Sequence, residues 1–180
     1  MSRKPKHIKN ALLFTFLLLS GQGLFNRARA QDVDYKSYSL FVYNFIKYIE
    51  WPDSKSQGDF VLGVLGDSPV IRELEKLAAT KKAKGRTIVI KRFSTAEEVT
   101  ECHLLYVTAG KSGTIKALRD KIKNKPMLIV GEREGLARKG ASLSFVTLED
   151  DVLKFDINKS EIELHNLKIP GTLILLGLLI

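Results

Sequence analysis

The chain has 180 residues and a formal net charge of +9, from 29 Lys and Arg against 20 Asp and Glu. Its composition, 44% hydrophobic and 27% charged, is that of one globular domain and excludes a disordered or collagen-like chain. A single cysteine excludes an internal disulfide framework, and three histidines give no obvious metal cage, so we expect no metal and no other cofactor.

Residues 1–30 carry the three parts of a secretory signal peptide. Basic residues precede a short apolar run at 11–19, and small side chains follow at Ala28 and Ala30. The apolar run is too short to cross about 30 Å of hydrocarbon, which argues against an uncut membrane anchor. We therefore expect cleavage after Ala30 and a mature domain of residues 31–180, outside the cytoplasm and without a transmembrane span.

The basic excess does not indicate a nucleic-acid partner. Six basic residues and no acidic ones lie in residues 1–30, so the mature chain carries 23 basic residues against 20 acidic ones. A basic region remains at 76–92, but basic side chains are favoured near a helix C-terminus and on solvated faces. We interpret this region as a solvated face, and contact with an anionic membrane surface or an acidic partner is the second interpretation.

The mature chain alternates helical and strand patterns. Apolar residues at helical spacing predict a first helix over 33–49, which ends before Trp51-Pro52 because a residue before proline avoids the helical region. Continuous apolar runs predict four buried strands, at 60–65, 87–90, 103–107 and 127–130.

Further helices are predicted between these strands. One has Ser68 as N-cap and Pro69 at its first helical position; a short helical turn follows at 97–100, and another helix at 115–123. This alternation favours an α/β fold, with a mostly parallel sheet and helices on both faces.

The C-terminal part has a different pattern. Runs at 142–147 and 152–157 are separated by four residues, which predicts an antiparallel hairpin that extends the sheet. Alternation within the second run predicts one buried and one more exposed face, with Asp156 on the exposed one. The apolar segment 170–180 is too short to span a bilayer, so we expect a core helix or a docking element.

Cys102 and His103 are the one place where a thiol and an imidazole are adjacent in sequence. Neighbouring residues of a strand point to opposite faces, so His103 is badly placed to activate Cys102, and a free cysteine is usually a small buried hydrophobe. An intermolecular disulfide is the second interpretation of this single cysteine, and a thiol enzyme is the least favoured.

Two weaker patterns have simpler explanations. Glu161 and His165 offer two metal ligands without a third, and we expect an exposed helix end there. The turn from Gly63 to Gly66 precedes a helix and so favours an anion. However, it lacks the full glycine pattern and Asp67 would repel phosphate, so we interpret it as a strand-to-helix turn.

The first helix and its end are unusually aromatic, because residues 35–51 hold seven of the fifteen aromatic residues of the chain. We expect Phe41, Phe45 and Trp51 to pack on the sheet. The remaining four form a candidate recognition surface or line a ligand pocket: Tyr35, Tyr38, Tyr43 and Tyr48.

Residues 41–52 read FVYNFIKYIEWP and resemble the opening signature of the YfiR family of periplasmic regulatory proteins. Later blocks follow in the family's order at 62–66, 102–107, Gly131, 144–145 and 155–158, so the resemblance covers 35–176. The positions that match the motif, and that we expect to be structural, are Phe41, Asn44, Phe45, Trp51, Pro52, Gly66, Cys102, His103, Phe155 and Asn158.

The resemblance implies a three-layer α/β/α domain that is not an enzyme. It also implies a periplasmic negative regulator that binds a membrane-bound diguanylate cyclase, or a sensory module of a histidine kinase, and that forms a homodimer. Better-known members carry more cysteines, and their disulfides affect stability. This chain has only Cys102, so control by an internal disulfide is excluded here. The alternative function is a periplasmic small-molecule-binding sensory protein, with its pocket at the aromatic helix and the carboxyl ends of the strands.

Overall fold

The computed structural model describes residues 33–180, so the predicted signal peptide lies outside the described residues. Eight strands of this part of the chain form one sheet in the order β2-β3-β1-β4-β5-β6-β7-β8. Their bounds are β1 (Phe60–Leu65), β2 (Lys82–Ala83), β3 (Arg86–Phe93), β4 (Leu104–Val107), β5 (Leu128–Gly131), β6 (Leu143–Thr147), β7 (Leu153–Ile157) and β8 (Leu178–Leu179).

The sheet is mostly parallel, as the sequence predicts. Strands β3, β1, β4, β5 and β6 run parallel in that order. The predicted hairpin is formed by β6 and β7, which pair antiparallel from Leu143 and Ile157 to Thr147 and Leu153. The chain passes from β1 to β3 on one side of β1 and then to β4 on the other side. The strand order therefore reverses beside β1.

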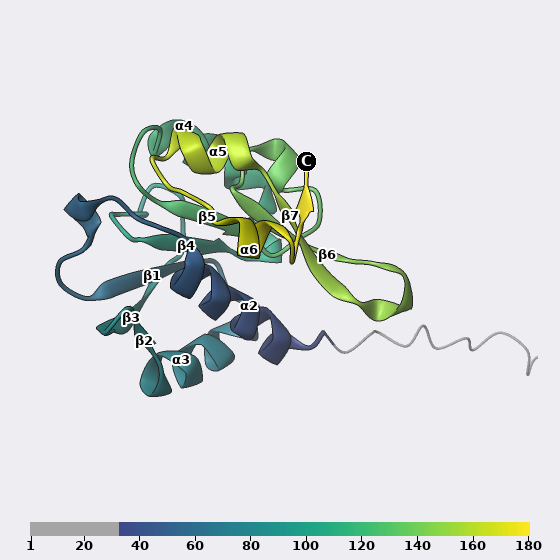
Figure 1. Cartoon of the computed structure of the whole chain (residues 1–180), viewed down its shortest axis with the longest axis horizontal. Coiled ribbons are helices and arrows are strands. Elements are labelled where there is room, and N and C mark those ends of the chain that lie inside the picture. Colours follow the sequence, from purple (N-terminus) through teal and green to yellow (C-terminus); the bar gives the residue numbers. More distant parts are fainter. Residues whose placement is uncertain (1–32) are drawn as a thin grey trace, which may run out of the picture. The chain divides into compact units, whose positions relative to one another are not determined.

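Helices cover both faces of this sheet, which confirms the predicted layered α/β architecture. Figure 1 shows α2 and α3 on one side of the sheet and α4 on the other. The helices are α2 (Tyr35–Tyr48), α3 (Val70–Thr80), α4 (Ile115–Lys121), α5 (Lys159–Leu164) and α6 (Gly171–Ile174), with 3-10 turns η1 (Asp53–Lys55), η2 (Ala109–Thr114), η3 (Ala137–Lys139) and η4 (Glu149–Asp151). Within residues 33–180, no helix has the length and apolar character that crossing a membrane requires.

Capping side chains set where α2 and α3 begin. The Asp34 carboxylate accepts hydrogen bonds from the backbone N–H groups of Lys36 and Ser37, at 3.2 and 3.3 Å. The prediction for α3 is wrong by one residue, since the helix begins at Val70 rather than at Pro69. The Ser68 hydroxyl still accepts from the Val70 N–H, at 3.3 Å.

The core has two parts because the central strands are buried on both faces. The part under α2 and α3 contains the largest buried side chains, among them Phe45, Phe60, Tyr106, Phe145 and Phe155. The part under α4 is mostly aliphatic, with Leu65, Leu105, Val107, Ile115, Leu118 and Ile129, and Phe93 is its one buried aromatic ring among the described residues. Burial on both faces explains why these strands read as continuous apolar runs in the sequence.

Three local predictions are wrong. Residues 97–100 contain no helix, because the chain makes only a turn there before β4. Asp156 is buried, since its side of β7 is covered as well. Of the two interpretations of the segment 170–180, the core helix is wrong: α6 makes one turn that buries Leu173, and the chain then adds β8 parallel to β7 at the edge of the sheet. The docking element stays a prediction. Leu175 between them is 85% exposed.

Candidate functional site

The inner face of α2 packs on the sheet through phenylalanine rings. Phe45 is fully buried, and its ring centroid lies 4.9 Å from that of Phe155 in an edge-to-face arrangement. Phe41 lies 5.5 Å from Phe155 and 6.2 Å from Phe145. Each such pair contributes about 0.5–1.5 kcal/mol beyond burial, so this side of α2 anchors the helix.

The four tyrosines of α2 do not form one surface. Tyr38 continues the core cluster, with its ring 4.3 Å from Phe145, and Tyr35 lies 5.8 Å from Tyr38. Tyr43 points toward β2, where its hydroxyl donates to the carbonyl of Lys82 at 3.4 Å. Helical spacing explains the separation, because positions 35 and 38 share a face that 43 and 48 do not.

Tyr48 is the most exposed of the four, at 36%. Lys47 lies over its ring, 4.9 Å from the centroid, and Tyr48 closes the C-terminal end of α2. Asn44 is half-buried on the same helix. This end of α2 therefore presents the most exposed aromatic ring of the helix.

The amino end of the sheet holds a tight aromatic cluster. The Trp51 indole N–H donates to the carbonyl of His103 at 3.1 Å, and its ring stands edge-to-face on Phe60 at 5.1 Å. Phe60 in turn stacks on the His103 ring at 4.5 Å. Pro52 directly follows this cluster and begins η1.

Both ring nitrogens of His103 have a structural partner. Nδ1 accepts from the Val61 N–H at 3.0 Å, so Nε2 carries the proton and donates to the carbonyl of Lys55 at 3.1 Å. Arg86 Nη1 donates to the same carbonyl at 2.7 Å. Burial lowers the pKa of His103, and the charges of Arg86 and Lys55 act in the same direction. The imidazole is therefore neutral and joins η1 to β1.

Cys102 lies on the opposite side of the chain from this cluster, in the core under α4. It is 1% exposed, and burial raises the pKa of its thiol to about 12. A thiol that is both inaccessible and protonated is neither a nucleophile nor able to reach another chain. These two facts contradict the thiol-enzyme and intermolecular-disulfide interpretations for the folded protein.

Asn158 connects two turns near the end of β7. Its Oδ1 accepts from the Glu161 N–H at 3.1 Å, which caps α5, and its Nδ2 donates to the carbonyl of Ala137 at 2.9 Å. Asn158 thus joins α5 to η3 through both ends of its amide.

The prediction of an exposed helix end at His165 is wrong. His165 is fully buried, with Nδ1 3.0 Å from the carbonyl of Lys125, because the short helix α5 packs its last turn against the chain that follows α4. Glu161 turns instead to Arg119, whose Nε lies 2.8 Å from both carboxylate oxygens. Among residues 33–180, no cluster of metal-ligating side chains was found.

The carboxyl ends of the strands hold a feature that the sequence analysis missed. Glu132, which directly follows β5, is 8% exposed. One carboxylate oxygen accepts from the Ser68 hydroxyl at 2.6 Å, and the other accepts from the Ala109 N–H. One carboxylate therefore joins the loops that follow β1, β4 and β5, at the place where the strand order reverses.

Two hydroxyls near Glu132 have no hydrogen-bond partner among the described residues. They belong to Tyr106 and Thr108, both fully buried at the end of β4. Burial raises the pKa of Tyr106 well above its ordinary value, and the Glu132 charge adds to this effect. Burial and the same charge raise the pKa of Tyr38. Buried polar groups without partners are rare, so these two hydroxyls leave this end of the sheet incompletely satisfied; the third such atom among the described residues is Nε2 of His165.

A signal for this cluster was present in the sequence. Ser68, Thr108 and Glu132 each follow a continuous apolar strand within three residues. Carboxyl ends of parallel strands meet at one edge, so polar residues in these positions come together. Glycine also has a role here: Gly66 has φ +91°, and a Cβ at this position would collide with Thr108 Oγ1.

Two surface hollows flank the loop after β1. The first, of about 280 Å³, is lined by Gly66, Asp67, Arg92, Phe93, Ser94 and Lys111. The second, of about 480 Å³, shares Asp67 and Arg92 with the first and extends along the start of α3. Both lie at the end of the sheet where α/β proteins bind ligands.

Comparison with known proteins places the chain in a family. A family model described as YfiR/HmsC-like matches residues 35–177. No curated protein sequence gives a match. Among solved structures, the chain is similar to the ABC domain in complex with L-Trp from Streptococcus pneumonia, with 15% sequence identity and a TM-score of 0.48. That similarity covers 67% of this chain and 55% of the other, so it spans about half of that structure.

Proposed function

Because this chain belongs to the YfiR/HmsC-like family over residues 35–177, we propose that it is a periplasmic, non-catalytic regulator. It binds the extracytoplasmic part of a membrane-bound diguanylate cyclase or sensor histidine kinase and represses it. The family match carries this proposal, since it spans nearly all of the described residues.

The chemistry of the candidate nucleophile supports binding rather than catalysis. Cys102 is buried with a raised pKa, and both nitrogens of His103 are used to connect η1 with β1. Neither side chain is free to exchange a proton with a bound molecule.

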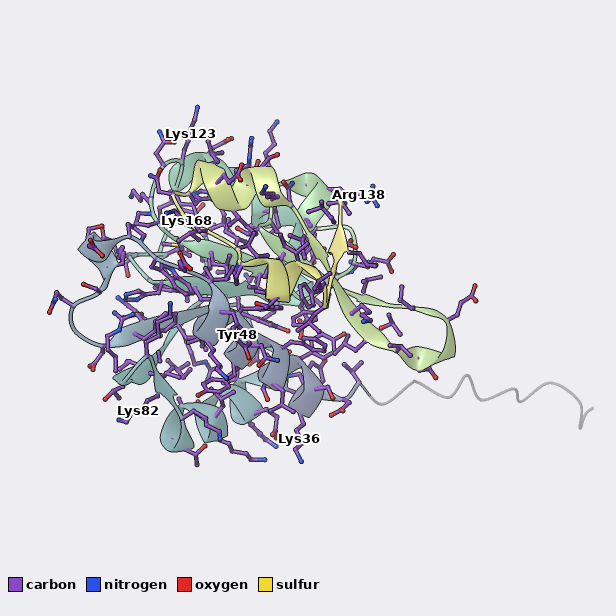
Figure 2. The ribbon with its side chains drawn as sticks, viewed as in Figure 1. Lys36, Tyr48, Lys82, Lys123, Arg138 and Lys168 are labelled. Atoms are coloured by element: carbon purple, nitrogen blue, oxygen red, sulfur yellow. The ribbon has the colours of Figure 1, made fainter. Side chains whose placement is uncertain are left out.

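The outer side of α2 is the partner surface in this proposal. Leu40 is 52% exposed on this helix, and Figure 2 labels Tyr48 at its C-terminal end and Lys36 near its start. Tyrosine is enriched at protein interfaces, and the exposed Leu40 adds apolar area beside Tyr48. Tyr43 borders this surface. Tyr35 and Tyr38 are half-buried and lie on the side of α2 that packs on Phe145.

A pull-down from detergent-solubilised membranes tests the proposal, with the protein itself as bait. We expect to recover a cyclase or a kinase, identified by mass spectrometry. The double variant Leu40→Ala/Tyr48→Ala should lose this partner while its stability changes by only about 1 kcal/mol or less. Leu148→Ala, a similarly exposed leucine on the β6–β7 hairpin, is the matched control and should keep it.

Recovery of no membrane signalling protein would contradict the proposed function. Recovery that survives the double variant would contradict only the assigned surface. The family resemblance also favours a homodimer, and light scattering of the purified protein measures its mass directly.

A further inference from the structure

The hollow of about 280 Å³ beside Gly66 is built from three strand ends. The Gly66 N–H donates to the carbonyl of Phe93 at 2.9 Å, and the Thr108 N–H donates to the carbonyl of Leu65 at 3.1 Å. These bonds hold the ends of β1, β3 and β4 in one place. The walls of the hollow are therefore set by the sheet rather than by a long loop.

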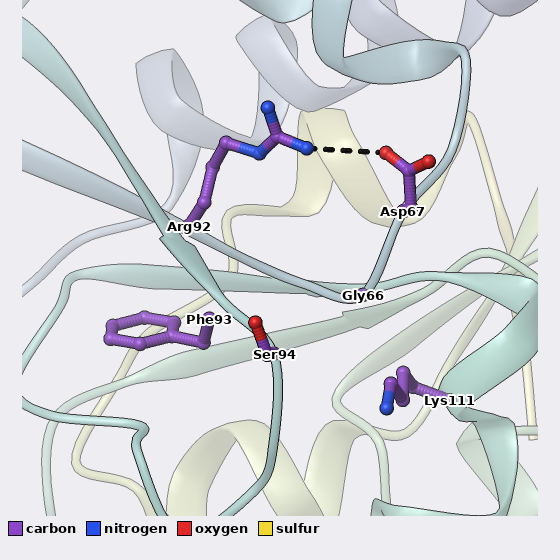
Figure 3. Close-up of a pocket in the computed structure, with 6 residues that line it drawn as sticks. All are labelled: Gly66, Asp67, Arg92, Phe93, Ser94 and Lys111. Atoms are coloured by element: carbon purple, nitrogen blue, oxygen red, sulfur yellow. Dashed lines mark hydrogen bonds and ion pairs between the residues drawn. The ribbon is translucent and has the colours of Figure 1, made fainter.

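The charged side chains of the hollow come from different elements. In Figure 3, Arg92 of β3 lies on one side of Gly66, and Lys111 of η2 lies on the other. Among the described residues, no carboxylate lies within ion-pair distance of the Lys111 ammonium. Ser94 adds a hydroxyl to the lining. Two cations and a hydroxyl around one small hollow are the groups that bind an oxyanion.

Asp67 already shows how an oxyanion is held there. Its Oδ1 lies 3.2 Å from Arg92 Nη2, and its side chain is 90% exposed. An ion pair this exposed contributes little to stability, so a soluble anion can replace it at low cost. The guanidinium has five N–H donors, and the bond to Asp67 uses one of them.

The larger neighbouring hollow is a weaker candidate, because Glu75 and Asp67 offset Arg72 and Arg92 in its lining. The smaller one keeps a net positive lining through Lys111. Glu132 occupies the nearby donors at Ser68 and Ala109, so an external anion is directed to Arg92 and Lys111.

We propose that the hollow beside Gly66 binds a small oxyanion, a phosphate or carboxylate group, between Arg92 and Lys111 in place of the Asp67 side chain. This site gives the regulator a soluble ligand independently of its membrane partner. If the protein binds no such anion, the proposed regulatory function is unaffected.

Thermal-shift titrations of the purified exported protein test the site, with inorganic phosphate in one series and acetate in another. Sodium chloride keeps the ionic strength constant. We expect a saturable rise of the melting temperature, since a ligand that binds only the folded state stabilises it. Arg92→Gln and Lys111→Gln should each weaken the apparent affinity roughly tenfold, and Asp67→Asn should strengthen it.

Two control variants remove one charge each at positions outside the hollow. They distinguish binding at the proposed site from an effect of the protein's net charge. Lys123→Gln alters an exposed lysine beyond the end of α4 (Figure 2), and Asp53→Asn alters an exposed carboxylate of η1. Both should bind like the unmodified protein. Binding of phosphate alone assigns a phosphate ligand, and equal binding of acetate extends the site to carboxylates. The absence of saturation with both anions, or equal effects in these two controls, would overturn the proposal.

Discussion

At the amino end of the sheet both ring nitrogens of His103 are hydrogen-bonded, whereas at the carboxyl end two buried hydroxyls, on Tyr106 and Thr108, have no partner among the described residues. The amino end is closed by aromatic stacking and backbone carbonyls. The carboxyl end is held by one buried carboxylate, Glu132, and borders two hollows.

This difference follows from the parallel topology. In a parallel sheet the chain leaves every strand at its carboxyl end. The loops after β1 and β4 lead to helices on opposite faces, so a gap opens between these two strands, where the strand order reverses. Polar groups converge on that gap, and Glu132 fills part of it. At the amino end no gap of this kind opens, and the rings of Trp51, Phe60 and His103 pack against one another there.

The largest expected effect comes from removing the carboxylate. Glu132→Ala leaves the Ser68 hydroxyl and the Ala109 N–H without their acceptor, and a hydrogen bond to a charged group contributes about 1.5–3 kcal/mol. We expect the free energy of unfolding to fall by about 2–4 kcal/mol, measured by urea denaturation.

Glu132→Gln is the control for this prediction. Its amide oxygen still accepts one of the two hydrogen bonds, so the loss should be about half as large. If Glu132→Ala leaves the urea midpoint unchanged, the carboxylate does not hold the three loops together.

A second effect concerns pH. Burial lowers the pKa of His103 and of His165, while both titrate near their ordinary value of about 6.5 in the unfolded chain. As the pH falls below about 6.5, the unfolded chain takes up protons first, so these histidines make folding less favourable. Their contribution to stability is complete above that pH and is lost on the acid side.

Urea midpoints measured over a series of pH values check this expectation. His103→Asn, at the amino end of the sheet, should reduce the fall of the urea midpoint at acid pH. His165→Asn, at the C-terminal end of α5, should reduce it as well. An acid-side slope that is unchanged in both variants would contradict a neutral buried form for these rings.

The smallest effect has the opposite sign. Thr108→Val removes an unpartnered hydroxyl and keeps the shape of the side chain, so stability should stay equal or rise by about 1 kcal/mol at most. Tyr106→Phe should change stability little, because this hydroxyl faces the Glu132 carboxylate without a well-formed hydrogen bond. Ser144→Ala is the contrast, because its hydroxyl accepts from the Ala137 N–H at 3.1 Å and its loss should cost about 1 kcal/mol. Destabilisation by both hydroxyl deletions would mean that the two ends of the sheet are equally satisfied.

Periodicity in the sequence predicted much of the fold. The run from Phe60 to Leu65 and the helical spacing of α2 are local patterns, and both elements appear within two residues of their expected bounds. The helical turn at 97–100 was predicted wrongly because short polar segments carry no periodic signal. The segment after Pro170 was misjudged for a different reason, because its apolar character did not reveal that it adds an edge strand.

The candidate site was harder to predict, because its members are far apart in the chain. Ser68 and Glu132 are 64 residues apart, and no local pattern links them. His165 was misjudged for a similar reason, since its burial depends on the chain after α4.

Local patterning by itself determined the α/β class, the helix that carries the aromatic signature and, through that signature, the family. Only the tertiary structure decided which polar residues meet, because the strand order brings the ends of β1, β4 and β5 together. It also decided that Cys102 is buried with a raised pKa, that His103 bonds to backbone groups through both ring nitrogens, and that Arg92 and Lys111 line one hollow. Burial and charge at a site are sums over distant neighbours, and a linear sequence does not show which neighbours those are.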